Sequence, residues 1–83
     1  FDNYPNPFNP VTAIGYRLSA VSNVDLSIYN LLGQKLATLV SEEQIPGTYE
    51  VEWDASGFSS GVYYYRLSTN SGFVQTKKLI LLK

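Results

Sequence analysis

The side chains that could carry chemistry in this 83-residue chain are few, because the sequence contains no Cys and no His. The absence of Cys excludes disulfides, thiolate nucleophiles and sulfur ligands, and the absence of His removes the commonest general base and metal ligand. Acid–base or metal chemistry would therefore depend on the seven Asp and Glu residues. Their spacing opposes no two carboxylates across a substrate, so the sequence predicts a protein that is not an enzyme and needs no cofactor.

Three of the acids, Glu50, Glu52 and Asp54, stand at alternate positions, which would place them on one face of a strand. With further oxygens from a loop, such a group would attract Ca²⁺. The usual explanation is a solvated strand face, and the tight acidic loop typical of calcium sites is absent. We therefore predict no metal site and keep calcium binding as an alternative.

The charges are divided unevenly along the chain, although the net charge is only −1. Residues 1–65 hold all seven acids and two bases, a balance of −5, whereas residues 66–83 hold four bases and no acid, a balance of +4. The small net charge gives no general attraction to nucleic acid, and no apolar run approaches the roughly 18 residues that a membrane-spanning helix needs. The sequence thus predicts a basic C-terminal segment on an acidic body, with neither nucleic acid nor a membrane as its partner.

The elements that position these charges are predicted to be β-strands. Hydrophobic residues make up 45% of the chain and charged residues 16%, which is enough apolar material for one packed core. Apolar and polar side chains alternate with period two, and no ten-residue stretch has helical periodicity. The predicted strands cover residues 11–18, 24–29, 35–40, 48–54, 62–68 and 73–82, with a seventh near the N-terminus.

Short strands joined by turn residues predict an all-β fold, an immunoglobulin-like or fibronectin-III-like antiparallel β-sandwich of about seven strands. We expect one domain over residues 1–83, with a Pro-rich extended lead-in over residues 1–10 and a terminal basic strand over residues 73–83. A bulge is predicted near Thr38, and a polar loop over residues 41–44.

The aromatic residues have structural as well as functional explanations. Trp53 precedes an Asp and suggests a stacking surface for sugar rings, yet it shares its strand face with Tyr49 and Val51, which indicates a core position. Tyr63 or Tyr65 is predicted to form a tyrosine corner, in which the hydroxyl bonds back to the preceding loop, in preference to acting as a catalytic acid.

Three lysines, Lys77, Lys78 and Lys83, give the last predicted strand its charge. Lysines on an edge strand discourage aggregation between sheets, which explains them without a partner. The chain also lacks an initiator Met and stops directly after this strand. We therefore expect the C-terminal piece of a longer polypeptide, in which the last strand is itself recognised.

Six short motifs follow one another along the chain. They are the opening Tyr4-Pro5-Asn6-Pro7-Phe8-Asn9-Pro10, the turn at residues 28–34, Gly47-Thr48-Tyr49, Trp53-Asp54, residues 60–67 and residues 77–83. In this order and spacing they closely resemble the type A C-terminal sorting domain of the type IX (Por) secretion system, over nearly the whole chain. The related immunoglobulin-like domain of flagellar hook-capping proteins shares some of these elements.

The resemblance implies an exported module at the C-terminus of a cargo protein. In the family, cargo crosses to the periplasm by a signal on the parent chain, and the domain then directs it to the outer-membrane translocon and on to the outer cell surface or the medium. The implied partners are the type IX translocon, sortase-like proteins that remove the domain, and the upstream cargo domain in the same chain. Carried over by position, the residues implied in recognition are Gly61, Tyr63, Lys77, Lys78, Leu79, Leu81 and Lys83.

Two other functions stay open at this point. The domain could be a non-catalytic accessory module of a secreted enzyme that binds carbohydrate, with Tyr29, Tyr64 or Trp53 as stacking surfaces. It could also be a structural spacer that stabilises its parent chain. Burial of Trp53 would weaken the carbohydrate-binding alternative.

Overall fold

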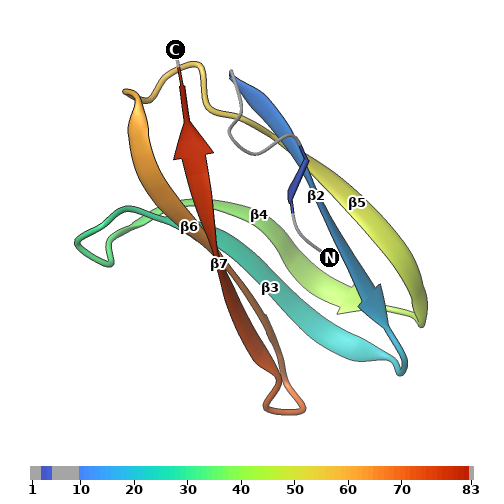
Figure 1. Ribbon diagram of the computed structural model, residues 1–83. Helices are drawn as coiled ribbons and strands as arrows, with labels where there is room; N and C mark the ends of the chain where they lie inside the picture. Colours follow the sequence, from blue (N-terminus) through green and yellow to red (C-terminus); the bar gives the residue numbers. More distant parts are fainter. Residues whose placement is uncertain (1–2, 5–9, 83) are drawn as a thin grey trace.

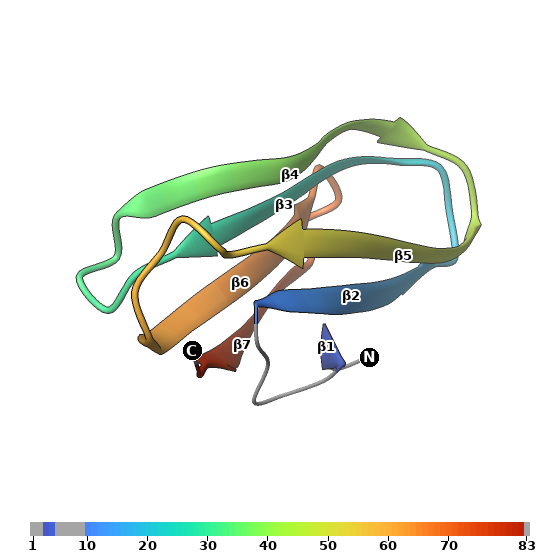
Figure 2. The same cartoon turned by 90° about the horizontal axis from the view of Figure 1, so that it is seen from above.

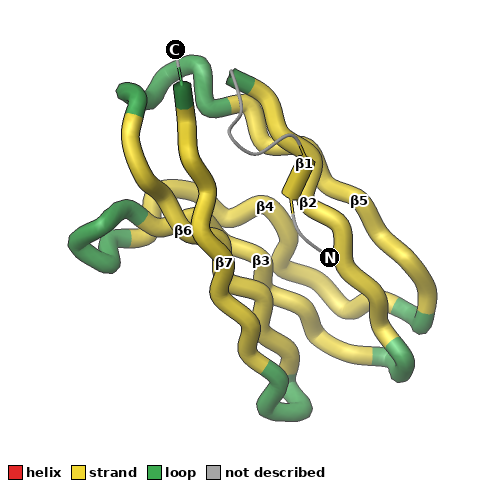
Figure 3. Tube along the Cα trace, viewed as in Figure 1, coloured by secondary structure: helices red, strands yellow, loops and turns green. Residues whose placement is uncertain are grey.

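The computed structural model describes residues 3–4 and 10–82, in which every regular element is a strand (Figure 3). Six strands have eight to ten residues, and the first has only two. They are β1 (Asn3–Tyr4), β2 (Val11–Leu18), β3 (Ser22–Tyr29), β4 (Lys35–Gln44), β5 (Gly47–Asp54), β6 (Gly61–Thr69) and β7 (Val74–Leu81). The predicted all-β class is confirmed, with six full strands and the two-residue β1 as a seventh element.

The strands form two antiparallel sheets that pack as two layers (Figures 1 and 2). The smaller sheet has the order β1-β2-β5, and the larger sheet has the order β4-β3-β6-β7. The connections β2–β3, β4–β5 and β5–β6 each cross from one sheet to the other. This arrangement is consistent with the predicted immunoglobulin-like sandwich.

The core lies between the sheets and is built from alternate side chains of the strands, as period-two patterning requires. Burial of apolar surface is the main force that holds such a core together, so both sheets depend on the same set of residues. The buried hydrophobic residues are Ile14, Tyr16, Leu18, Val24, Leu26, Ile28, Val40, Trp53, Ala55, Tyr63, Tyr65, Leu67, Leu79 and Leu81.

Strand β4 is irregular where it pairs with β3. Two register shifts flank Thr38 and leave Leu36 and Leu39 without a direct partner across the ladder. The predicted bulge near Thr38 is therefore confirmed, with a second irregularity beside it. A bulge interrupts strict alternation, which explains how Leu36, Ala37 and Leu39 all pack against the core.

The predicted polar loop over residues 41–44 is wrong, because β4 continues through this segment to Gln44. Gln44 pairs with Ser22 on β3, and its side chain reaches the other sheet, where it accepts a hydrogen bond of 2.5 Å from the Tyr16 hydroxyl. Backbone pairing along a solvated strand end thus outweighs the polar composition that indicated a loop.

The N-terminal lead-in falls mostly outside the described residues. Within it, Asn3 and Tyr4 form β1, which pairs with Ile14 and Ala13 of β2. At its end, the carbonyl oxygen of Pro10 accepts a hydrogen bond of 2.9 Å from the backbone N–H of Ala55.

Candidate recognition surface

The residues implied in recognition converge on β6 and β7, which run side by side from Gly61 opposite Leu81 to Ser68 opposite Val74. Strand β7 ends the strand order of the larger sheet, and β6 is its only partner among the described strands (Figure 1). A strand at the end of a sheet lies at its border, where a partner can approach it. The geometry therefore places the side chains of β7 at a border of the larger sheet.

Lys77 and Lys78 lie in the middle of β7, on opposite faces of it. Lys77 pairs with Tyr65, is half-buried and lies on the side that faces the core. Lys78 pairs with Tyr64, is exposed and lies on the outer side. Because consecutive residues of a strand alternate between faces, two adjacent lysines give this edge a positive charge on both sides.

Leu79 and Leu81 hold β7 in place, since both side chains are 0% exposed. In the folded domain they cannot touch a partner directly, and their contribution goes through the position of the strand. Lys83, the last of the implied residues, lies outside the described residues.

Gly61 and Tyr63 begin β6. Gly61 has a φ of 155°, a conformation that L side chains rarely adopt, and a Cβ there would meet nothing within 4 Å. The Tyr63 hydroxyl donates a hydrogen bond of 2.6 Å to the carbonyl oxygen of Ser59 in the preceding loop. This bond confirms the predicted tyrosine corner and fixes the loop that leads into β6.

Trp53 is a core residue, as its strand face predicted. It is 3% exposed, and its ring packs on Phe58 at 5.6 Å and against Tyr63 at 5.8 Å between centroids. A ring buried in this way cannot serve as a stacking surface for sugars, so the carbohydrate-binding alternative loses Trp53.

Glu50, Glu52 and Asp54 lie exposed on the outer side of β5, and we call them the acidic face. In the part of the chain that the structure describes, no group of three or more potential ligand side chains is close enough to hold a metal ion. The solvated strand face is therefore the explanation that the geometry supports, and we assign no calcium site.

The outer side of the larger sheet gathers residues that sequence reasoning treated separately. Tyr29 pairs with Tyr64, Tyr64 pairs with Lys78, and Lys35 pairs with Tyr29, so these four side chains form one row across β4, β3, β6 and β7. Directly opposed residues of antiparallel strands lie on the same face. Together with Arg66 of the neighbouring row, they form what we call the aromatic–basic face.

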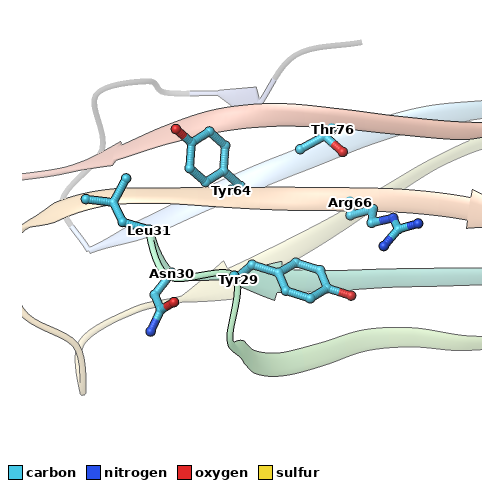
Figure 4. Close-up of a pocket in the computed structure, with 7 residues that line it drawn as sticks. Tyr29, Asn30, Leu31, Tyr64, Arg66 and Thr76 are labelled. Atoms are coloured by element: carbon cyan, nitrogen blue, oxygen red, sulfur yellow. The ribbon is translucent and has the colours of Figure 1, made fainter.

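A shallow cavity of 380 Å³ lies on the aromatic–basic face. Figure 4 views this face from outside, with Tyr29 pointing along the sheet towards Arg66 and Tyr64 pointing the other way, towards Leu31. Its lining residues are Tyr29, Asn30, Leu31, Gly33, Tyr64, Arg66 and Thr76. The sequence predicts which side chains of each strand point outward. It does not predict the strand order that brings these side chains together.

The turn between β3 and β4 supports one end of this face. The Asn30 side-chain oxygen accepts hydrogen bonds from the backbone N–H of Leu32 at 2.9 Å and of Gln34 at 3.0 Å. Gly33 has a φ of 80°, in the left-handed region that favours glycine. These contacts fix the turn and hold Leu31 at the rim of the cavity.

Comparison with known families gives a match over nearly the whole chain. A family model described as the secretion system C-terminal sorting domain matches residues 2–82. No curated protein and no solved structure matches the chain. The described residues contain no helix of the length and hydropathy needed to cross a membrane.

Proposed function

The chain belongs to the family of secretion system C-terminal sorting domains, and we propose that β7 is the element that the secretion machinery recognises. The family assignment makes the domain a C-terminal sorting signal for type IX secretion, which is not catalytic. It implies a cargo protein and export to the cell surface or the medium. A carbohydrate-binding module or a spacer is not favoured as the main role.

The full route that we propose has three steps. The cargo is the domain upstream of residues 1–83 in the same chain, and it reaches the periplasm before sorting begins. The sandwich, with residues 1–10 as lead-in and residues 73–83 as terminal strand, then binds the outer-membrane translocon. A sortase-like protein acts on the chain afterwards.

The observation that carries the proposal is the edge position of β7 with a lysine on each side. A partner that approaches this border of the larger sheet meets β7 before the other described strands of that sheet. Lys77 and Lys78 then supply specificity and faster encounter with a partner of negative charge. The partner thus recognises both the position and the charge of this one strand.

The other implied residues act by positioning this edge. Leu79 and Leu81 anchor the inner side of β7 in the core, and Gly61 and Tyr63 fix the start of β6, which pairs with β7. We propose that Lys83 extends the positive charge beyond the strand.

The test is surface delivery of a reporter that carries a periplasmic export signal and is fused ahead of residues 1–83, in a host with a type IX system. Deleting the end of the chain would remove the buried Leu79 and Leu81 and unfold the domain, so the informative variant is Lys77→Gln with Lys78→Gln. We expect surface delivery to fall about tenfold, because both charges at the edge are lost.

The matched control is Arg17→Glu, which changes the net charge by the same amount at an exposed position on the smaller sheet. This control should be delivered as the wild-type fusion is. Circular dichroism must show that both variants fold. Normal delivery of the double variant would disprove the role of the two lysines.

A further inference from the structure

The aromatic–basic face is a second surface whose composition points to a partner. Tyr29 and Tyr64 are half-buried, whereas Arg66, Lys35 and Lys78 are exposed. Tyrosine and arginine are among the residue types that most often dominate binding energy in protein interfaces, and the rims of such interfaces are polar. None of these side chains contributes to the buried hydrophobic core, so packing of the sandwich does not explain them.

Two exposed leucines extend this face. Leu31 is 67% exposed and Leu32 is 83% exposed, in a turn where a polar residue would satisfy the same backbone. Leu31 lines the cavity beside Tyr64 (Figure 4). Adjacent apolar side chains held in solvent by a fixed turn are typical of surfaces that become covered by protein. A saccharide would bury less apolar surface against these leucines than a protein would, because hydroxyl groups cover its edges.

The charge of the face sets the chemistry of the partner. Lys35, Arg66 and Lys78 contribute three positive charges to this face. Two acids lie on the same side of the sheet. Asp25 accepts a hydrogen bond of 2.7 Å from Ser27, and Glu43 pairs with Asn23, at the end of β3 away from Tyr29. The acidic face lies on the opposite layer, so the domain has a positive and a negative side despite its net charge of −1. Such a charge separation orients the domain as it approaches a charged surface.

We propose that the aromatic–basic face docks onto a flat acidic surface of a protein of the secretion machinery. In this complex, Tyr29, Tyr64 and Leu31 bury their apolar parts, and Arg66 pairs with a carboxylate of the partner. This inference rests on the proposed sorting function and adds a second contact to β7. The two contacts share Lys78, which lies on the outer side of the edge strand.

Site-directed photocrosslinking tests the docking proposal in the living host. A benzophenone amino acid replaces Leu31 in the reporter fusion, and mass spectrometry maps the crosslinked segment of the captured partner. We expect a segment rich in Asp and Glu from a protein of the secretion machinery. Arg66→Glu should reduce the crosslinking yield about tenfold, whereas Arg17→Glu, with the same change of charge, should leave it unchanged.

Charge exchange makes the result specific. Changing an acidic residue of the mapped segment to Lys should restore crosslinking to the Arg66→Glu variant. A crosslinked segment without excess acid, a polysaccharide as the product, or equal yields with and without Arg66→Glu would each overturn the proposal.

Delivery assays separate this proposal from the role of β7. If Tyr64→Ala with Arg66→Glu is delivered normally while Lys77→Gln with Lys78→Gln is not, docking is disproved and recognition of β7 stands. If crosslinking and delivery depend on Arg66 but the two lysines can be replaced without effect, docking stands and recognition of β7 falls. Circular dichroism of each fusion confirms that the domain is folded.

Discussion

The outer sides of the two sheets differ in chemistry although they cover one core. On the smaller sheet, Ala13 and Gly15 of β2 stand opposite Glu52 and Glu50, which gives a side of small and acidic residues. On the larger sheet, tyrosines pair with each other and with lysines across four strands. The inner sides of both sheets contribute to one apolar core, so packing constrains these positions more than those on the outer sides.

The difference between the two outer sides indicates which positions of this domain are free to specify a partner. A core position tolerates little change because lost volume lowers stability, whereas an exposed position away from special contacts usually changes stability by less than about 0.5 kcal/mol. Cross-strand tyrosine pairs contribute about 0.2–1 kcal/mol to a sheet, and it is to the outer tyrosine row that we assign the proposed docking. The four predictions below test this division between the inner and outer sides, in order of decreasing effect.

The largest effect is expected from Trp53→Ala, which removes a buried ring that both sheets share. Trp53 contacts Phe58 and Tyr63 and is 3% exposed, so its loss leaves a cavity between the layers. The free energy of unfolding should fall by about 3–5 kcal/mol, which is most of the stability of a domain of this size. Urea unfolding followed by circular dichroism measures it.

The control for this change lies on the same strand. Glu52→Ala alters the acidic face next to Trp53 and should change the free energy of unfolding by less than about 0.5 kcal/mol. If the two variants lose similar stability, the division between inner and outer sides is wrong.

The second prediction concerns the turn that carries Leu31. Gly33→Ala places a side chain at a φ of 80° where a Cβ meets nothing within 4 Å, so only backbone strain opposes it. The cost should be about 1–2 kcal/mol, with a lower melting temperature by several degrees. Crosslinking from position 31 should weaken as the turn distorts, while the acidic face is unaffected.

Gly57→Ala is the matched glycine control. A Cβ at this loop position also meets nothing within 4 Å, and its φ is outside the left-handed region. Its melting temperature should stay within about one degree of the wild type or rise slightly, because alanine restricts the unfolded chain. An equal loss in both variants would argue against strain at Gly33.

A third, smaller effect is expected from Tyr63→Phe, which keeps the ring and removes only the hydroxyl. The carbonyl oxygen of Ser59 then loses its 2.6 Å hydrogen bond in a partly buried place. The free energy of unfolding should fall by about 0.5–1.5 kcal/mol. Tyr64→Phe, one residue along on the outer side, should be nearly neutral in chemical unfolding, and a larger loss there would contradict the assignment of sides.

Much of this architecture is predictable from alternation alone. Apolar residues that repeat at every second position predict inner sides for Ile14, Leu26 and Trp53, and all three are buried. The predicted loop over residues 41–44 is wrong, because backbone pairing does not depend on which residue types occupy a solvated strand.

The candidate surfaces were harder to predict than the core. The lysines of β7 stand next to each other in the sequence, so their shared strand was visible in advance. The aromatic–basic face joins residues from four strands, and their neighbourhood depends on the order β4-β3-β6-β7 and on the bulges that set the register of Lys35. Neither the strand order nor the register follows from local pattern.

The smallest predicted effect is a pH dependence at the contact between the inner side of β2 and the end of β4. Burial raises the pKa of Tyr16 above its ordinary 10.0, with further contributions from Tyr49 and Glu42. The folded state therefore holds the phenol proton more tightly than the unfolded chain does. The stability from this group is fully present below pH 10 and is lost as the pH rises through the raised pKa of the folded state.

Urea unfolding between pH 8 and pH 11 measures this loss. Tyr16→Phe has no phenol to ionise, so its stability should decline less above pH 10 than that of the wild type. Parallel curves for the two proteins would show that burial of this phenol does not hold its proton.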